Sequence, residues 1–510
     1  MGAKGIGDNC HDHLIEIRKR KMKKNWAWFG LGVISVAIAV WQILLAGQGL
    51  KTITIRSDNP PVTIITPANI PPASRPTVLI AHGFAGSAVL MRGFALTLAH
   101  AGYTTVSWDF EGHGANPNPL ELSADLSGLL QDAESALADA GQTGLIDMQR
   151  VAILGHSMGS GVALSYGITH PNTFATIAIS PVSQKVTSQL PHNLLLMAGS
   201  FEPQFVSSAE SILAQAGGEN GNKTDGIARQ MTVIPNVEHI SILFSPTAQA
   251  DARSWLDGTF GVQPGATDYT DHRILWYGLG IVGFIFLSVA VITSLPSSSI
   301  NSPTRTTIWN GLLALIGGSL LATIILWLLS KAGLDITQLL GLLVGGYIIF
   351  WFGVAGVVSL FIRRPHISFP KANELVKGLI AFLALWLGVG LLGNFVWLPW
   401  LLIPSRLALW VPATIITFPW FFAVGEAAKR SKVAGQIGWW LIQVIVVVGG
   451  LYLALSLSPG LGFIFLILPV IPIMLGLQAL VLSPRHGPWA YALSGAMFTS
   501  WLLLAVFPLQ

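Results

Sequence analysis

Charged side chains and cysteines are scarce in this sequence of 510 residues. Only 10% of the residues are charged and 52% are hydrophobic, whereas a soluble protein carries about 25% charged residues. Cys10 is the only cysteine, which excludes an intramolecular disulfide and selects no compartment. Basic residues are not interleaved with aromatic ones in a patch, so the sequence gives no reason to expect nucleic acid as a partner.

The few charges are unevenly distributed along the chain. Residues 48–272 hold 18 acidic and 9 basic side chains, a net charge of −9, and the remaining residues carry +13. The first segment has the composition of a soluble domain, and the rest has the composition of a membrane protein.

The N-terminal residues predict a membrane anchor. Residues 1–25 are polar and end in the basic run 18–24, and residues 26–46 are apolar and uncharged. About 20 apolar residues suffice to cross a bilayer, and the basic run predicts a cytoplasmic N-terminus. A cleaved signal peptide is the alternative, although a clear small-x-small site is missing. Both interpretations put residues 48–272 outside the cytoplasm.

Residues 273–510 consist of long apolar runs, which predict a membrane domain of about eight helices and nine spans in total. The runs lie near residues 274–295, 308–330, 338–362, 378–398, 407–425, 437–456, 460–482 and 488–508. Loops expected inside carry nine Lys or Arg residues and those expected outside carry two, as the positive-inside rule requires. The proline-rich stretch 391–420 permits a re-entrant pair instead. These spans hold no cluster of acids or histidines, which ion-coupled transport usually needs.

The soluble segment alternates strand-like and helix-like patterns, which predicts an α/β domain with a mostly parallel sheet of eight strands. The strand-like runs are 51–56, 62–66, 77–81, 104–108, 151–154, 176–180, 193–197 and 231–235. Ligands of such sheets bind beyond the carboxyl ends of the strands.

A Gly-x-Ser-x-Gly turn follows the strand-like run 151–154. In Gly155-His-Ser-Met-Gly159, the glycines permit a tight strand-to-helix turn that exposes the hydroxyl of Ser157. Ser157 is therefore the candidate nucleophile. The backbone N–H of Met158, at the start of the next helix, is a candidate oxyanion donor.

The other catalytic groups are expected after neighbouring strands. His82-Gly83-Phe84 ends one strand, and the N–H of Phe84 is the expected second oxyanion donor. His239 follows the last strand and is the candidate base. Glu202 follows a buried strand between the serine and the histidine and is the candidate orienting acid, with Glu238 as its rival.

These motifs resemble the α/β-hydrolase superfamily over about residues 50–260. In order they are His82-Gly83-Phe84, Asp109-Phe-Glu-Gly-His113-Gly114, Gly155-His-Ser-Met-Gly159, Gly199-x-x-Glu202 and His239. The resemblance implies a Ser–acid–His triad acting on esters, thioesters, amides or related bonds. Glu202 stands where Asp is commoner. Asp109 and His113 match a loop that is interpreted as shaping the edge of the site. About a dozen residues separate Ser180 from the next strand, so little or no cap is expected.

Taken together, the sequence predicts a membrane-bound serine hydrolase that acts on lipid or acyl esters. No cofactor and no metal are expected, and Cys10, His11 and His13 are interpreted as part of a disordered tail. An acyltransferase or a serine peptidase with the same triad is the first alternative. The second is a transporter or lipid-handling membrane protein with a hydrolase-like binding domain.

Overall fold

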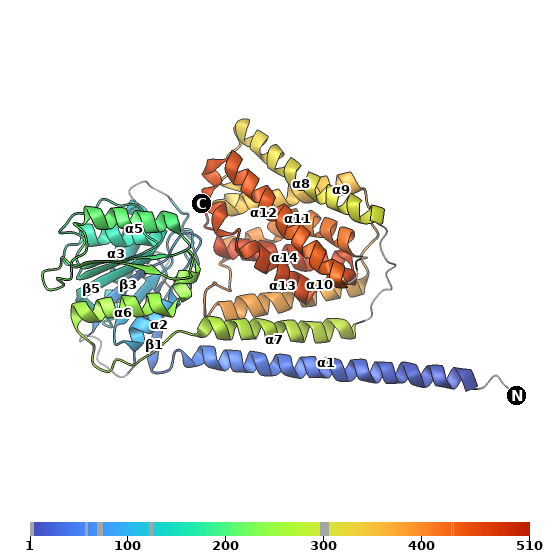
Figure 1. Cartoon of the computed structure of the whole chain (residues 1–510), viewed down its shortest axis with the longest axis horizontal. Helices are drawn as coiled ribbons and strands as arrows, with labels where there is room; N and C mark the ends of the chain where they lie inside the picture. Colours follow the sequence, from blue (N-terminus) through green and yellow to red (C-terminus); the bar gives the residue numbers. More distant parts are fainter. Residues whose placement is uncertain are drawn as a thin grey trace. The chain divides into compact units, whose positions relative to one another are not determined.

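The computed structural model describes residues 5–56, 60–68, 75–121, 126–295, 305–429, 431 and 433–510 (Figure 1). Side chains 5–21, 305–307, 433 and 434 are outside this description. The chain forms two compact units. The helical unit contains residues 1–40, 277–392 and 407–504, and the sheet unit contains residues 41–276, 393–406 and 505–510. Two distant segments thus belong to the sheet unit although the sequence did not predict them there.

The sheet unit is built on eight strands in the order β1-β2-β4-β3-β5-β6-β7-β8. Their bounds are β1 Leu50–Ile55, β2 Val62–Pro67, β3 Pro76–Ala81, β4 Thr104–Trp108, β5 Asp147–His156, β6 Ala175–Ile179, β7 Leu194–Gly199 and β8 Arg229–Ile234. The β1–β2 and β2–β4 pairs are antiparallel, and all other pairs are parallel. This confirms the predicted mostly parallel sheet.

Helices cover both faces of the sheet (Figure 1). They are α2 Arg92–His100, α3 Ser127–Gln142, α4 Met158–Thr169, α5 Pro203–Gln215 and α6 Pro246–Phe260. Buried apolar residues of α2 and α6 pack on one face of the central strands, and those of α4 and α5 pack on the other. β3, β4, β6 and β7 are buried along their whole length, as parallel strands between two helical layers are.

The register of the parallel strands places their carboxyl ends at one edge. Ala81 pairs with Gly155, His156 with Ile179, and Gly199 with Ile234. The residues that follow these positions are the predicted site residues. The connection from β6 to β7 contains neither helix nor strand, which agrees with the expected lack of a cap at this position.

The helical unit contains long apolar helices that agree with most of the predicted spans. Eight helices among the described residues are long and apolar enough to cross a membrane: Met22–Leu45, Arg273–Ser294, Ile308–Lys331, Gly345–Arg363, Ala372–Leu391, Pro404–Ala428, Gly435–Leu457 and Pro488–Val506. The run expected at 460–482 is a pair of shorter helices, Pro459–Leu466 and Val470–Val481, bent by 51°. The full count of nine therefore stays a prediction, as does the orientation.

The proline-rich stretch 391–420 does not form the pair of short helices that the re-entrant alternative requires. Pro412 and Pro419 lie inside one continuous helix, α11 Pro404–Ala428. The break comes before it, after the π-helical turn Trp386–Leu391 that extends α10 Ala372–Leu385. Proline is tolerated inside a long apolar helix where neighbouring groups satisfy the carbonyl that it frees.

Candidate active site

Ser157 occupies a strained turn between β5 and α4. Its backbone has φ 53° and ψ −119°, a region that residues with a side chain rarely adopt. A Cβ on Gly155 would lie 1.9 Å from the carbonyl oxygen of Gly159, and a Cβ on Gly159 would lie 2.5 Å from that of Ala81. Only glycine fits at both positions, which is the steric reason for the Gly-x-Ser-x-Gly pattern.

The structure brings Ser157 together with His239 and Glu202, which the sequence singled out. His239 Nε2 lies 3.0 Å from Ser157 Oγ, and His239 Nδ1 lies 2.8 Å from Glu202 Oε2. His239 is 6% exposed and Glu202 is 2% exposed. This geometry permits a proton to move from the hydroxyl to a ring whose other nitrogen faces a carboxylate.

The carboxylate of Glu202 is fixed by further donors. Its Oε1 accepts hydrogen bonds from Ser180 Oγ at 2.6 Å and from the backbone N–H of Gly199 at 2.5 Å. Glu202 Oε2 therefore remains directed at His239. Sequence reasoning did not assign a role to Ser180; the available signal was its position directly after β6, at the same sheet edge.

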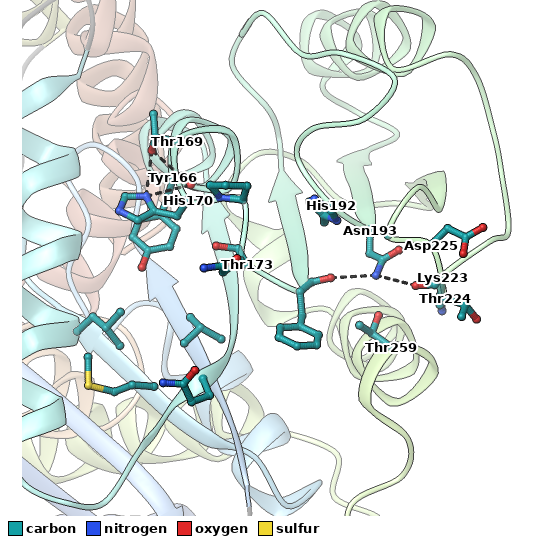
Figure 2. A pocket seen from close by; sticks show the side chains of 18 residues that line it. Tyr166, Thr169, His170, Thr173, His192, Asn193, Lys223, Thr224, Asp225 and Thr259 are labelled. Carbon is teal, nitrogen blue, oxygen red and sulfur yellow. Dashed lines mark hydrogen bonds between the residues drawn. The ribbon is translucent and has the colours of Figure 1, made fainter.

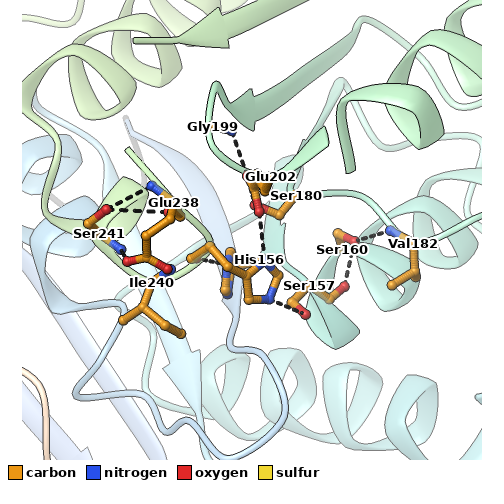
Figure 3. Close-up of polar contacts among 11 residues, drawn as sticks. His156, Ser157, Ser160, Ser180, Val182, Gly199, Glu202, Glu238, Ile240 and Ser241 are labelled. Carbon is orange, nitrogen blue, oxygen red and sulfur yellow. Dashed lines mark hydrogen bonds and ion pairs between the residues drawn. The ribbon is translucent and has the colours of Figure 1, made fainter. Parts of the chain in front are cut away.

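The rival carboxylate, Glu238, faces its own loop. Its oxygens accept hydrogen bonds from the backbone N–H groups of Ile240 at 3.0 Å and Ser241 at 2.7 Å (Figure 3). Glu238 thereby stabilises the turn that carries His239, and the carboxylate beside the His239 ring is that of Glu202.

The two expected oxyanion donors lie on elements next to Ser157. Met158 begins α4, and the first N–H groups of a helix have no partner within the helix. Phe84 follows Gly83, and a Cβ on Gly83 would lie 3.1 Å from the Cβ of Ser157. The oxyanion role of both N–H groups stays a prediction.

Two aromatic rings, those of Phe205 and His156, contact the ring of His239. The Phe205 ring stacks on it with centroids 4.3 Å apart. The His156 ring lies 4.7 Å away, and its Nε2 donates to the backbone carbonyl of His239 at 2.9 Å. Burial, followed by the neighbouring His239, holds the pKa of His156 well below its usual value. His156 is therefore a neutral donor that supports the loop, a role that the sequence analysis does not predict.

A second group of buried side chains holds the loop that carries Phe84. Asp109 accepts hydrogen bonds from the backbone N–H groups of Ala88 and Ala115, each at 2.8 Å. The backbone N–H of Phe110 donates to His82 Nε2 at 3.0 Å. Burial lowers the pKa of His82, which favours the neutral ring that this bond requires.

The His113 ring packs against the loop that carries Phe84. It lies 5.1 Å from the His82 ring and 5.8 Å from the Phe84 ring. Burial, followed by His82, holds the pKa of His113 well below its usual value. His113 therefore contributes an uncharged ring at this edge of the site.

No group of three or more His, Cys, Asp or Glu residues in the described part of the chain is arranged to hold a metal ion. The side chains of Cys10, His11 and His13 lie outside the described residues.

A separate hollow lies at the opposite edge of the sheet. It measures about 1160 Å³, and Tyr166, His170, His192 and Lys223 are among the residues that line it (Figure 2). Its lining includes residues that directly precede β6 and β7, so it lies at the amino ends of the strands. None of its lining residues belongs to the Ser157 site.

Known proteins resemble this chain over the sheet unit. The family described as serine aminopeptidase, S33, matches residues 72–253. A monoacylglycerol lipase of Mycolicibacterium smegmatis is 29% identical over 106 residues, which cover 21% of this chain and 37% of the lipase. The putative esterase NocK of Nocardia uniformis is 23% identical over 249 residues, 40% of this chain and 72% of that protein. Epoxide hydrolase A of Mycobacterium tuberculosis is 30% identical over 117 residues, 23% of this chain and 34% of the relative.

A solved structure is similar as well. The crystal structure of a predicted CIB-like hydrolase from Thermoplasma acidophilum has 16% sequence identity and a TM-score of 0.33, and the match covers 41% of this chain and 97% of that chain. The chain spans only about a third of the length of the lipase and of the epoxide hydrolase. The domain of about residues 50–260 is therefore an α/β-hydrolase domain.

Proposed function

We propose that this protein is a membrane-bound serine hydrolase that cleaves carboxylic esters of acyl chains. The observation that carries the proposal is the continuous hydrogen-bonded series from Ser157 Oγ through the His239 ring to Glu202. The names of two relatives, a monoacylglycerol lipase and a putative esterase, support an ester as the substrate.

The proposed reaction has two halves. Ser157 Oγ attacks the carbonyl carbon while His239 Nε2 takes its proton, and the N–H groups of Phe84 and Met158 stabilise the oxyanion. The imidazolium returns its proton to the leaving alcohol as the ester bond breaks. Water then attacks the acyl-serine with His239 as the base again, releasing the acid and the free serine. Glu202 stabilises the charged ring in both halves.

Exposed apolar side chains support an apolar substrate and a membrane location. Phe201, directly before Glu202, is 65% exposed. On the helical unit, Leu313, Ile415 and Ile445 are exposed by 61%, 67% and 68%. Apolar side chains in such positions suit contact with acyl chains or lipid. In this proposal the eight helices, and the bent pair as a ninth span, hold the protein in the membrane.

The proposed topology follows the distribution of charge. Residues 1–25 are the cytoplasmic tail, 26–46 the anchor helix, 48–272 the extracytoplasmic hydrolase domain, and 273–510 the membrane domain. The supporting observation is the excess of Lys and Arg in the loops assigned to the cytoplasm.

Peptidase action is the second candidate, because the matching family is described as a serine aminopeptidase. An aminopeptidase needs a carboxylate for the ammonium group of its substrate. Glu202, which is hydrogen-bonded to His239, and Glu238, which precedes it in sequence, already accept hydrogen bonds from the protein. This favours ester hydrolysis over peptide hydrolysis.

Hydrolysis by the full-length protein in detergent tests the proposal. We expect release of p-nitrophenol from p-nitrophenyl butyrate and of fatty acid from a monoacylglycerol, with little release of p-nitroaniline from amino acid p-nitroanilides. Ser157→Ala should abolish the ester activity. Ser165→Ala, on the same helix, should retain it. Ester hydrolysis that persists in Ser157→Ala, or a preference for the anilides, would contradict the proposal.

A further inference from the structure

Two distant segments of the chain form part of the sheet unit. The tail Ala505–Gln510, which follows α14 Pro488–Val506, and residues 393–406, which precede and begin α11, belong to it. Both make hydrogen bonds to loops at the carboxyl edge of the sheet. Arg406 and the tail residues Phe507–Leu509 are called the strap below.

The strap binds the loop 109–120 through backbone hydrogen bonds. The N–H of Leu509 donates to the carbonyl of Gly112 at 2.9 Å, and the N–H of Leu120 donates to the carbonyl of Leu509 at 2.8 Å. Gly112 has φ 71°, and a Cβ there would lie 2.5 Å from the carbonyl oxygen of Leu509. The glycine therefore gives the strap room to reach the loop.

Arg406 ties the tail and the loop together. Arg406 is 1% exposed, and its guanidinium donates to the carbonyl of Phe507 at 2.7 Å and to the carbonyl of Gly112. A buried guanidinium is stable only when acceptors compensate for the water that it loses. Because both acceptors are backbone carbonyls, Arg406 fixes the path of the two segments relative to each other.

The loop 109–120, which the strap binds, in turn holds residues 82–91, which carry Phe84 and are called the oxyanion loop below. Asp109, at the start of the strap-bound loop, accepts from the N–H of Ala88, and Phe110 donates to His82. The His113 ring, directly after Gly112, lies against the ring of Phe84. A shift of Gly112 would therefore reach Phe84 through a short series of contacts.

Residues 393–395 contact the start of α2, which directly follows the oxyanion loop. Arg92, which begins α2 directly after that loop, donates to the carbonyl of Asn394 at 3.1 Å. Arg273 donates to the carbonyl of Phe395 at 2.5 Å, and its guanidinium is paired with Asp271 at 2.6 Å. Segments from the C-terminal half of the chain thus contact both the loop 109–120 and the start of α2.

We propose that Arg406 and Leu509 are positioning residues for the hydrolase site. By fixing Gly112 and the loop 109–120, they hold the N–H of Phe84 where it stabilises the oxyanion. The proposal rests on the proposed function for its catalytic consequence. Under this proposal, the first residues of α11 and the tail after α14 also position the catalytic site, in addition to the membrane anchoring proposed for these helices.

Matched variants of the full-length protein in detergent test the proposal. Arg406→Gln removes both guanidinium bonds, and Leu509→Pro removes the N–H that donates to Gly112. Gln510→Pro, one residue further, is the control, and Arg406→Lys tests rescue by a conservative cation. The readouts are kcat and KM for p-nitrophenyl butyrate, the inhibition constant of an alkyl trifluoromethyl ketone, the midpoint of thermal unfolding, and hydrogen exchange of peptides from residues 82–92.

Arg406→Gln and Leu509→Pro should lower kcat by about 10- to 100-fold, less than loss of a whole oxyanion donor. Both variants should raise the inhibition constant of the ketone, which forms an oxyanion when it binds, by a similar factor. KM should stay within about 3-fold of its value for the unaltered protein. Exchange at residues 82–92 should accelerate. Arg406→Lys should recover part of kcat, and Gln510→Pro should behave as the unaltered protein.

The proposal would be overturned if Arg406→Gln left kcat and the exchange unchanged. It would be overturned equally if kcat, KM and exchange throughout the protein changed together with the unfolding midpoint, as a general loss of stability predicts. The exchange measurement needs no catalysis. If the unaltered protein hydrolyses no ester, the proposed function fails. Hydrogen exchange at residues 82–92 then still tests the strap: faster exchange in the variants means that the strap holds the loop, and unchanged exchange means that it does not.

Discussion

Replacing Glu202 by glutamine should abolish most activity without unfolding the protein. The carboxylate accepts three hydrogen bonds, from His239 Nδ1 at 2.8 Å, Ser180 Oγ at 2.6 Å and the Gly199 N–H at 2.5 Å. A glutamine amide has nearly the same shape, but one end of it is an NH2 group that only donates. One of the three donors must therefore face another donor.

Both orientations of the amide can be examined from these contacts. If the NH2 group takes the Oε1 position, it meets the N–H of Gly199, whose direction is set by the backbone. If it takes the Oε2 position, His239 Nδ1 must accept a hydrogen bond, and the ring proton moves to Nε2. In that tautomer Nε2 cannot take the proton of Ser157. Because the hydroxyl and ring can adjust whereas the Gly199 N–H cannot, the second orientation should dominate.

The expected loss in kcat is about 10⁴-fold, the effect known for the wrong tautomer in such a triad, which corresponds to about 5.4 kcal/mol of activation free energy. The assay is hydrolysis of p-nitrophenyl butyrate at saturating ester, with thermal unfolding as the check on folding. Glu238→Gln is the matched control, because its carboxylate binds only its own loop. A loss below about 10-fold in Glu202→Gln, or an equal loss in Glu238→Gln, would refute the assignment of the acid.

Three further outcomes follow from the packing and the charges around the site. Gly83→Ala should lower kcat by about 100-fold, a loss typical of misplacement by 1 Å, because its Cβ would lie 2.9 Å from His156 Nδ1; unchanged kinetics would contradict this. Phe205→Leu should lower kcat about 5-fold through lost stacking on the charged His239 ring, with KM unchanged. The three buried histidines near the site have lowered pKa values, so the unfolded chain binds more protons below about pH 6.5. Burial raises the pKa of Asp132 to about 7, which has the opposite sign but involves one group against three, so the free energy of unfolding should fall by about 2 kcal/mol from pH 6.5 to pH 5.5. Urea unfolding in detergent at pH 6.5 and 5.5 measures this, and a flat profile would contradict the burial of these neutral rings.

Local patterns were sufficient to predict the fold of the sheet unit. Alternating apolar strands and helices predicted eight strands. Glycine at positions 155 and 159 indicated a tight turn at Ser157, because a side chain at either position would collide with neighbouring backbone. Strand ends of a parallel sheet meet at one edge, so residues after β7 and β8 were expected near Ser157. The distances from His239 to Ser157 and Glu202 agree with this expectation.

Contacts made through the backbone could not be predicted in the same way. The bonds of Leu509 and Arg406 to Gly112 join residues almost 400 and 300 positions apart, and backbone donors and acceptors are the same for nearly every residue type. From the sequence, Arg406 is only one of the two basic residues in loops expected outside. The roles of Ser180 and His156 could not be predicted either, because a serine after a strand and a histidine beside a nucleophile have many structural uses.

The most direct test of the central claim is the site of covalent labelling by a fluorophosphonate. The full-length protein in detergent is treated with the probe, and the modified peptide is identified by mass spectrometry. The account predicts one adduct, on Ser157, absent from Ser157→Ala and formed far more slowly in His239→Ala. Undiminished labelling of Ser157→Ala, or an adduct on another residue, would contradict it.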